Sequence, residues 1–324
     1  MDANLFRNLE DIPSRFRGGA LAIGNFDGVH RGHARLVERL LAMAAKVGGP
    51  AVVFTFNPHP AQLLRPQAAH TPLAWTERNA MLLRELGVDA VVAFPTDMAF
   101  LQLDAEQFFQ KVVRERLDAR GMVEGANFYF GHNRSGTVSV LHEYCAKAGI
   151  SLEVVDTIEI NGQIVSSSRI RGLISSGWVD HAAELMGRPY RIRGQVVLGE
   201  MRGQRLGFPT ANIERVDTLL PGEGVYAAAA CWREGEQEFT YPAAVSIGGN
   251  PTFDVDTFKV EAHLIGYEGS LYDRRIELDF LARLRDCERF DSAHELITQM
   301  KLDVSTTRRI VDRRYRREEQ KIES

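Results

Sequence analysis

The stretch GNFDGVHRGH (residues 24–33) decides how the first half of the chain folds. It follows a short apolar run, ALAI (residues 20–23), and precedes an apolar pattern of helical spacing that starts at Ala34. A strand therefore leads into a turn rich in glycine, and the turn opens onto the N-terminus of a helix. Because the first N–H groups of a helix are unpaired and carry a partial positive charge, such a terminus suits a phosphate group.

Glycines and histidines recur within this turn. Gly24, Gly28 and Gly32 have no Cβ atom, so the backbone can approach an anion closely. His30 and His33 are three residues apart, so one helical turn can direct both imidazoles at the same point. A histidine pair alone is more often part of a surface loop, but the strand and helix around this pair favour a nucleotide-binding site.

Strands and helices alternate after this turn. The apolar patterns predict helices at residues 34–47, 75–86, 104–117 and 137–148, and short buried strands at residues 51–56, 88–94 and 151–156. Alternation at this spacing predicts a doubly wound, Rossmann-like α/β sheet. Ligands bind beyond the carboxyl ends of the strands in such sheets, and His30 and His33 fall at one of these ends.

Two further stretches with polar and aromatic side chains fall at comparable strand ends. In FNPHP (residues 56–60), His59 either reaches a phosphate or fills a turn that two prolines stiffen. The stretch EGANFYFGHNRSG combines Asn127 with the rings of Phe128, Tyr129 and Phe130. Such rings can stack on a flat heterocycle, although clustered aromatic residues more often belong to a core.

A third stretch, SSSRIRG (residues 166–172), follows an Asn-Gly turn. Hydroxyl groups and two arginines at the start of a helix can bind a triphosphate. Alternatively, Ser167 only caps the helix and the arginines are solvated. The sequence pattern by itself leaves both interpretations open.

The composition limits the class of protein. A chain of 324 residues is longer than one core usually supports, so we expect two domains. The formal net charge of −4 gives no electrostatic argument for binding nucleic acid or membranes. Cys145, Cys231 and Cys287 lack metal-site spacing, and no apolar stretch approaches the roughly 20 residues of a membrane span. We therefore expect a cytoplasmic protein, a monomer or weak homo-oligomer, without nucleic-acid or membrane partners.

The pattern changes at GRPYRIRG (residues 187–194), where we place the border between a first domain (1–186) and a second (187–324). Short β-rich runs separated by glycine-containing turns follow, at residues 190–199, 224–232, 239–248, 258–266 and 274–284. They predict a small closed or nearly closed β-barrel. A long C-terminal helix follows residue 291, and its mixed basic end is predicted to be a solvated face.

The stretch GEMRGQRLGFPTAN is the part of the second half that suggests chemistry. Gly199, Gly203 and Gly207 can fold backbone N–H groups around an anion, although the stretch lacks the ending of a Walker A loop. Thr210 and Asn212 close the stretch with neutral oxygen atoms. Such ligands suit a hard cation that carries nucleotide phosphates.

Glu261 lies in FKVEAHLIG (residues 258–266), where the period-2 pattern separates two faces. The apolar face, expected to line the barrel core, comprises Phe258, Val260, Ala262 and Leu264. Glu261 lies on the other face, where it is either a solvated surface carboxylate or a base that accepts the proton of a hydroxyl.

These motifs resemble those of a known family. GNFDGVHRGH is similar to the HxGH signature of the nucleotidyltransferase superfamily, in the version found in prokaryotic bifunctional riboflavin kinase/FAD synthetases. LGFPTAN, GNPTF (residues 249–253) and KVEAHL are similar, in that order, to the riboflavin kinase half of the family. The resemblance covers residues 18–305. It implies that ATP phosphorylates riboflavin to FMN in the second domain, and that a second ATP adenylylates FMN to FAD in the first, releasing pyrophosphate.

The resemblance also implies roles for individual residues. In adenylyltransfer it makes His30, His33 and Arg171 catalytic, and Gly24, Phe26, Ser167 and Ser168 nucleotide-binding. It places Asn127, Phe128 and Phe130 by the flavin. In the kinase half it assigns ATP to Gly199, Gly203 and Gly207, Mg²⁺ with ATP to Thr210 and Asn212, and the role of base to Glu261.

Four positions depart from the family pattern. Ser168 stands for a threonine and keeps the hydroxyl, whereas Tyr129 stands where arginine is common. Ser246 replaces an asparagine, and Asp273 replaces a glycine. Two other functions remain open: a transferase with one activity whose other domain only binds flavin, and a non-catalytic flavin sensor. Intact GNFDGVHRGH and LGFPTAN argue against the sensor.

Overall fold

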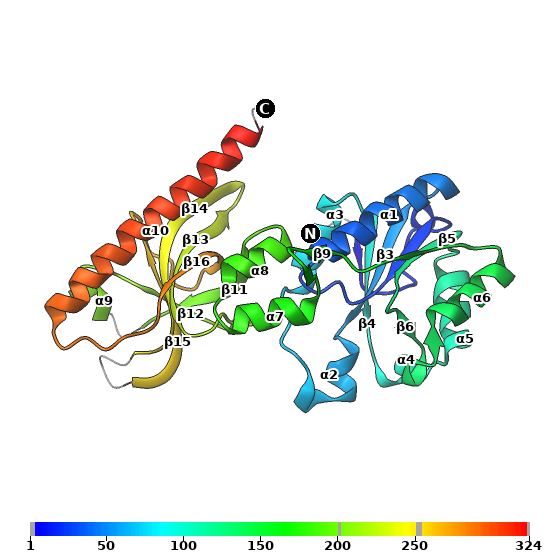
Figure 1. Cartoon of the computed structure of the whole chain (residues 1–324), viewed down its shortest axis with the longest axis horizontal. Coiled ribbons are helices and arrows are strands. Elements are labelled where there is room, and N and C mark those ends of the chain that lie inside the picture. The colour runs from blue at the N-terminus through cyan, green and yellow to red at the C-terminus, as the bar shows by residue number, and fades with distance from the viewer. Residues whose placement is uncertain (1–3, 200–201, 251–254, 323–324) are drawn as a thin grey trace. The chain divides into compact units, whose positions relative to one another are not determined.

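The structure is a computed structural model that describes residues 4–199, 202–250 and 255–322 (Figure 1). Contacts within the chain divide it into two compact units, Met1–Ser167 and Ser168–Ser324. The predicted border between residues 186 and 187 lies further along the chain. Two helices, α7 (Ser167–Ser175) and α8 (Val179–Met186), occupy the interval between these positions.

The first unit is built on a six-stranded parallel sheet. The strand order is β1 (Leu5–Phe6), β4 (Ala90–Pro95), β3 (Ala51–Asn57), β2 (Ala20–Ile23), β5 (Gly121–Gly125) and β8 (Ser151–Val155). From β2 the chain builds outward through β3 to β4, and then crosses to the other side of β2 to form β5 and β8. The topological switch point therefore lies between β2 and β5, where such sheets open a crevice for ligands.

Helices cover both faces of this sheet. Ala20 and Ala22 of β2 pack in the core beneath α1 (Arg31–Val47) and α3 (Thr76–Glu85). Leu21 and Ile23 point to the opposite core, which includes residues of α5 (Ala105–Phe108), η3 (Phe109–Arg116) and α6 (Val138–Ala148). Strands buried on both faces explain the continuous apolar runs of the sequence. The predicted doubly wound, Rossmann-like fold is confirmed.

Shorter elements complete the first unit. They are η1 (Ser14–Phe16), α2 (Pro60–Leu64), η2 (Pro66–Ala68), α4 (Met98–Leu101), η4 (His132–Arg134) and the hairpin pairs β6 (Tyr129–Phe130) with β7 (Gly136–Thr137) and β9 (Glu159–Ile160) with β10 (Gln163–Ile164). The helix expected from Ala34 begins at Arg31 instead. His30 is its N-cap residue, and His33 lies inside its first turn.

The second unit is a closed, antiparallel six-stranded barrel. The strand order is β11 (Tyr190–Val197), β12 (Ala211–Glu214), β15 (Val255–Leu264), β14 (Gln237–Asn250), β13 (Gly224–Glu234) and β16 (Arg275–Arg285). Val260, Ala262 and Leu264 of β15 are buried, as the alternation predicts. The side chain of Phe258, expected on the same face, lies outside the described residues.

Helices cover parts of the barrel wall. The long C-terminal helix α10 (Ala293–Ile322) runs along β13, β14 and β16 (Figure 1). β13 is buried along most of its length, because the core covers one of its faces and α10 packs on the other. α8 packs on β11 and β16, and the short helix α9 (Arg202–Arg205) lies in the loop that joins β11 to β12. The predicted barrel and C-terminal helix are both confirmed.

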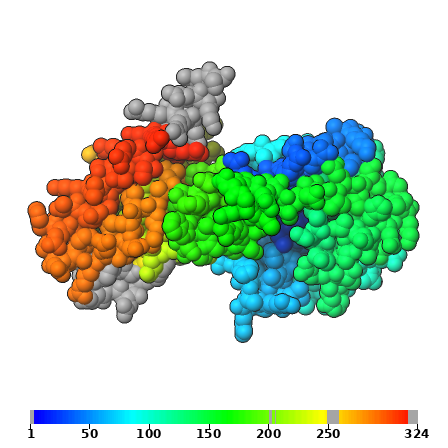
Figure 2. All heavy atoms as spheres, viewed as in Figure 1, coloured from blue at the N-terminus to red at the C-terminus, as the bar shows by residue number. Residues whose placement is uncertain are grey.

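Figure 2 shows the surface that these elements present in the view of Figure 1. Among the helices that the structure describes, none has the length and apolar character needed to cross a bilayer.

Candidate functional sites

The turn between β2 and α1 is held rigidly by hydrogen bonds. The carboxylate of Asp27 is buried and accepts from the backbone N–H of Leu73 at 2.9 and 3.0 Å, and of Ala74 at 3.2 Å. The backbone N–H of Gly28 donates to Asn79 Oδ1 at 3.0 Å. Asp27 therefore serves the geometry of the turn, a role that sequence reasoning missed.

The backbone of the turn is strained. Phe26 and Val29 have φ angles of 44° and 36°, in the left-handed region that side chains with a Cβ atom rarely adopt. Gly28, between them, has a φ of 77° at no steric cost. Strain of this kind persists only where the surrounding structure enforces it, and it is common at functional sites.

His30 and His33 come together at the start of α1. Nδ1 of His30 accepts from the backbone N–H of His33 at 3.4 Å, so the proton of the neutral His30 ring lies on Nε2. The two rings stack, with centroids 3.8 Å apart and planes 13° apart. The Phe26 ring lies 5.1 Å from that of His33. A Cβ atom on Gly32 would lie 3.1 Å from the His30 ring, so this glycine makes room for the pair.

The start of α7 reaches the same turn. Oγ of Ser167 donates to the carbonyl oxygen of Asp27 at 3.2 Å. Ser168 and Arg171 follow on α7, where Ser168 is exposed and Arg171 is half-buried. Residues four apart share a helix face, so Ser167 and Arg171 lie on the same side of α7.

The predicted flavin stretch leaves the end of β5. Asn127 is exposed, Phe128 is half-buried, and the stacked rings of Phe128 and Phe130 lie 5.5 Å apart. Phe130 is only 6% exposed and belongs to the core. Tyr129 is exposed, and the guanidinium of Arg134 lies 4.1 Å from its ring centroid.

His59, in the FNPHP stretch, caps a helix. Its Nδ1 accepts from the backbone N–H of Ala61 at 3.0 Å, at the start of α2. This hydrogen bond gives the histidine a structural role in the turn.

The barrel site is built around two glycines that make room for side chains. A Cβ atom at position 199 would lie 1.9 Å from Nδ2 of Asn212, so only glycine allows the Asn212 amide to sit there. A Cβ atom at position 203 would lie 2.4 Å from the carbonyl oxygen of Phe208 and 3.4 Å from Oγ1 of Thr210. Gly207 has a φ of 85° with open space around it, so it serves the turn.

Strand register brings Glu261 next to Asn212. Asn212 on β12 pairs directly with Glu261 on β15, and Glu261 pairs in turn with Ser246 on β14. Directly opposed residues in an antiparallel sheet share a face and have Cβ atoms about 4.5–5.5 Å apart. Glu261 is half-buried on the face opposite to the barrel core. Thr210 lies two residues before Asn212, just ahead of the start of β12 at Ala211.

The loop that carries Thr210 is fastened to β15. Nδ1 of His263 donates to the carbonyl oxygen of Pro209 at 2.8 Å, and the rings of Phe208 and His263 meet edge to face at 5.4 Å. His263 is a positioning contact that sequence reasoning missed, although it lies on the same strand face as Glu261. The structure therefore sets Asn212 beside Glu261 and fastens the residue before Thr210 to the strand that carries Glu261.

Two features noted in the sequence remain, Asp273 and the GNPTF motif (residues 249–253). Asp273 has a φ of 62°, which explains why a glycine is common there, because glycine adopts this conformation without strain. Of the GNPTF motif, residues 251–253 lie outside the described residues.

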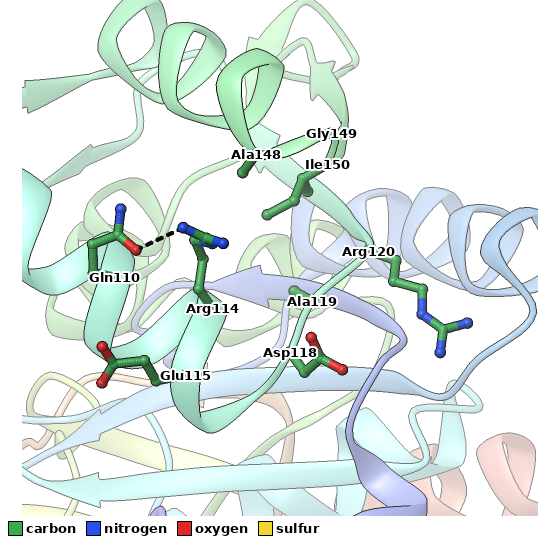
Figure 3. Close-up of a pocket in the computed structure, with 9 residues that line it drawn as sticks. All are labelled: Gln110, Arg114, Glu115, Asp118, Ala119, Arg120, Ala148, Gly149 and Ile150. Carbon is green, nitrogen blue, oxygen red and sulfur yellow. Dashed lines mark hydrogen bonds between the residues drawn. The ribbon is translucent and has the colours of Figure 1, made fainter.

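A polar cavity of about 430 Å³ lies in the first unit (Figure 3). Its lining includes residues 118–120, just before β5, and residues 149–150, just before β8. It is therefore at the amino ends of the strands, opposite the HxGH turn. Arg114 bonds Gln110 at 3.1 Å, and Arg120 extends away from them. The two guanidinium groups do not converge on one point.

Within the residues that the structure describes, no group of three histidine, cysteine, aspartate or glutamate side chains could hold a metal ion.

Comparison with known proteins accounts for both units. A family model described as FAD synthetase matches residues 12–169, and one described as riboflavin kinase matches residues 186–311. A bifunctional riboflavin kinase/FMN adenylyltransferase from Pseudomonas fluorescens is 34% identical, covering 94% of this chain and 96% of the relative. One from Escherichia coli (strain K12) is 32% identical, covering 93% and 95%. A solved structure from Streptococcus pneumoniae, described as a macrolide-efflux protein, is 30% identical with a TM-score of 0.82, covering 94% of this chain and 98% of that one.

Proposed function

The chain belongs to the family of bifunctional riboflavin kinase/FMN adenylyltransferases, and from this membership we propose which residues carry each reaction. The protein transfers a phosphate from ATP to riboflavin, giving FMN. It then joins FMN to the adenylyl group of a second ATP, giving FAD and pyrophosphate. The assignment of residues within each unit is our proposal.

We assign adenylyltransfer to the turn between β2 and α1. The phosphate of FMN attacks the α-phosphorus of ATP, and the bond to pyrophosphate breaks. Because this nucleophile is already anionic, the site needs no base, and catalysis depends on alignment and on stabilising the leaving charge. Nε2–H of His30 and the ring of His33 supply donors, together with the N–H groups at the start of α1. The other nucleotide ligands in this proposal are Gly24, Phe26, Ser167, Ser168 and Arg171.

The flavin of FMN is assigned to the loop after β5. Asn127, which is exposed, offers an amide for hydrogen bonds to the ring edge or ribityl chain. Phe128 is half-buried and offers a ring for stacking. Phe130 stacks behind Phe128 in the core and supports its orientation.

Glu261 is proposed as the base of the kinase reaction. A primary hydroxyl is a weak nucleophile at neutral pH, so a carboxylate has to accept its proton as the γ-phosphoryl group transfers. The observation that carries this assignment is the register that sets Glu261 beside Asn212. Gly199, Gly203 and Gly207 shape the loop that would hold the ATP phosphates.

Mg²⁺ is proposed as the divalent ion that accompanies ATP. The site fits a hard cation, because Thr210 and Asn212 offer neutral oxygens and Gly199 leaves space for the Asn212 amide. When bound, the ion would neutralise charge on the ATP phosphates. Thr210 and Asn212 would hold the ion, and Glu261 on the next strand would remain available to the hydroxyl.

Incubation of the full chain with riboflavin, ATP and Mg²⁺ tests the function. Chromatography should show FMN first and FAD later, and excess chelator should stop both. A chain with one activity would give only one of these products from riboflavin or added FMN. A non-catalytic sensor would give neither while still shifting flavin fluorescence.

We further propose that the protein is cytoplasmic and is a monomer or weak homo-oligomer without nucleic-acid or membrane partners. Its substrate ATP and its free thiols at Cys145, Cys231 and Cys287 support a reducing, ATP-rich compartment. Size-exclusion chromatography with light scattering at several concentrations would test the oligomeric state.

A further inference from the structure

Glu124 is a buried carboxyl group that the proposed reactions do not use. It lies in β5 and is 1% exposed. Burial raises the pKa of this carboxyl well above its usual value. Its Oε1 accepts a hydrogen bond from the backbone N–H of Ile23, the last residue of β2, at 2.8 Å. A buried polar group of this kind is costly unless it is satisfied, so its position calls for an explanation.

The bond spans the topological switch point of the sheet. β2 and β5 are paired only at their beginnings, where Ala20 faces Gly121 and Leu21 faces Met122. Beyond that register the backbone ladder between them ends, and the N–H of Ile23 bonds the Glu124 side chain instead. The carboxyl group therefore joins the two strand ends where the backbone does not.

Both strand ends lead directly into the proposed substrate loops. Ile23 precedes Gly24, the first residue of GNFDGVHRGH, whose N–H is held by the carbonyl oxygen of Phe54 at 3.0 Å. Glu124 precedes Gly125, whose carbonyl oxygen accepts from the N–H of Phe128 at 3.0 Å. A single side-chain hydrogen bond thus links the start of the ATP turn to the start of the flavin loop.

We propose that Glu124 is a positioning residue for adenylyltransfer, and that its carboxyl oxygen sets the spacing between the ATP turn and the flavin loop. The proposal rests on the assignment of those two loops to ATP and FMN. In-line attack requires the reacting atoms to lie about 3–3.5 Å apart, and a misplacement of about 1 Å can cost roughly 10²-fold in rate. A spacer between the two loops therefore acts on the rate of transfer rather than on either substrate alone.

Glu124→Leu, Glu124→Gln and Met122→Leu test the proposal in the full chain. Glu124→Leu removes the acceptor and keeps most of the volume, whereas Glu124→Gln keeps an acceptor of the same shape. Met122→Leu is the matched control, because Met122 is buried on the same strand and in the core but makes no bond to Ile23. FMN formation by the barrel of the same chain reports the amount of active protein.

We expect Glu124→Leu to lower the turnover number of FAD formation by about 10-fold or more, with KM for ATP and FMN changed by less than about threefold. Glu124→Gln should restore most of this turnover, and Met122→Leu should keep it. Two results obtained with folded chains overturn the proposal: a Glu124→Leu chain with normal turnover, or a Glu124→Gln chain as impaired as Glu124→Leu.

A second substitution covers a failure to fold. If Glu124→Leu shows no cooperative melt, Glu124→Met replaces it, because methionine is unbranched like glutamate and has no carboxyl oxygen. If neither chain folds, Glu124 serves the stability of the sheet and the positioning role is wrong. If the wild-type chain makes FMN but no FAD from added FMN, the assignment of adenylyltransfer fails, and this outcome is distinct from a failure of the Glu124 proposal.

Discussion

The turn after β2 and the barrel site are both assigned to ATP, and they differ in what their carboxyl groups do. In the turn, Asp27 accepts from the N–H groups of Leu73 and Ala74, and just before the turn Ile23 donates to Glu124 of the neighbouring strand β5. These acids are buried and bonded to backbone. In the barrel, Glu261 is half-buried on the face away from the core, beside Asn212. One site uses its acids to shape the backbone, and the other presents an acid at the proposed reaction centre.

The chemistry of the two reactions explains this difference. The nucleophile of adenylyltransfer is the FMN phosphate, which is anionic, so a further carboxylate at the reacting atoms would only add repulsion. The nucleophile of the kinase is a hydroxyl, which has to lose a proton. Imidazoles and backbone N–H groups suit the first task, and a carboxylate suits the second.

Separating the units is the strongest test of this comparison. We expect the fragment 168–324 to convert riboflavin into FMN and to make no FAD. The shorter fragment 187–324 should also make FMN and no FAD, provided that it folds. Its folding is less favourable, because it lacks four side chains of α8 that are buried in the structure: Val179, Ala182, Leu185 and Met186. Burial of each of the three larger side chains, Val179, Leu185 and Met186, contributes about 1.5–3 kcal/mol. Product chromatography and thermal melts of both fragments give the answer.

The outcome for the two fragments also locates the border. If only 168–324 folds and phosphorylates riboflavin, the functional second unit starts where the contacts place it. If 187–324 is equally stable and active, the border predicted between residues 186 and 187 stands. A folded 168–324 fragment without kinase activity would contradict the assignment of the kinase reaction to this unit.

Glu261→Gln tests the role of the half-buried acid on the barrel. The substitution preserves shape and removes basicity, so kinase turnover should fall by about 10²–10⁴ while KM for riboflavin and ATP changes little. FAD formation from supplied FMN should be unaffected and serves as the internal control. Kinase turnover near that of the wild type would show that Glu261 is a surface carboxylate, and the contrast between the two sites would then be lost.

His33→Ala tests the site that has no base. Removing one preorganised donor should lower the rate of FAD formation by about 10²–10³, while FMN formation stays near normal. The measurement is FAD released from supplied FMN and ATP. His59→Ala is a matched control, because His59 is a histidine at another helix start whose Nδ1 caps α2. Equal losses in both variants would mean that histidine at a helix start, and not the HxGH pair, explains the effect.

Much of this architecture can be predicted from the hydrophobic patterns of the sequence. Apolar runs predict strands buried on both faces, and the alternation in β15 predicts that Val260, Ala262 and Leu264 point inward, as they do. The GNFDGVHRGH turn and the EGANFYFGHNRSG stretch could likewise be placed at strand ends from the sequence. The pairing of Asn212 with Glu261 could not be predicted, because register depends on contacts between strands far apart in the chain.

Other features are absent from any local pattern. The helix α1 begins at Arg31 rather than Ala34 because the His30 side chain caps it, and apolar periodicity does not detect a cap. The sequence pattern suggests that Gly187 belongs to a linker. In the structure it ends α8, a helix whose apolar face packs on β11 and β16. Glu124 is one acid within an apolar strand, and only the structure shows that its partner is the backbone of β2.

Glu124 gives the smallest expected effect and the finest test of how the turn uses its acids. Because burial raises the pKa of Glu124 in the folded protein, the native state holds its proton more tightly than the unfolded chain does. Stability is therefore lost as the pH rises from about 4.5 through the raised native pKa.

Glutamine cannot ionise and keeps an acceptor for Ile23, so Glu124→Gln should melt at a higher temperature than the wild type at about pH 8, with the difference shrinking toward about pH 5. A change of 1 kcal/mol corresponds to about 2–4 °C in a unit of this size. Met122→Leu changes no ionisable group, so its melts should differ from those of the wild type by the same amount at both pH values. A pH-independent gap for Glu124→Gln would mean that Glu124 keeps its proton, or loses it, equally in both states.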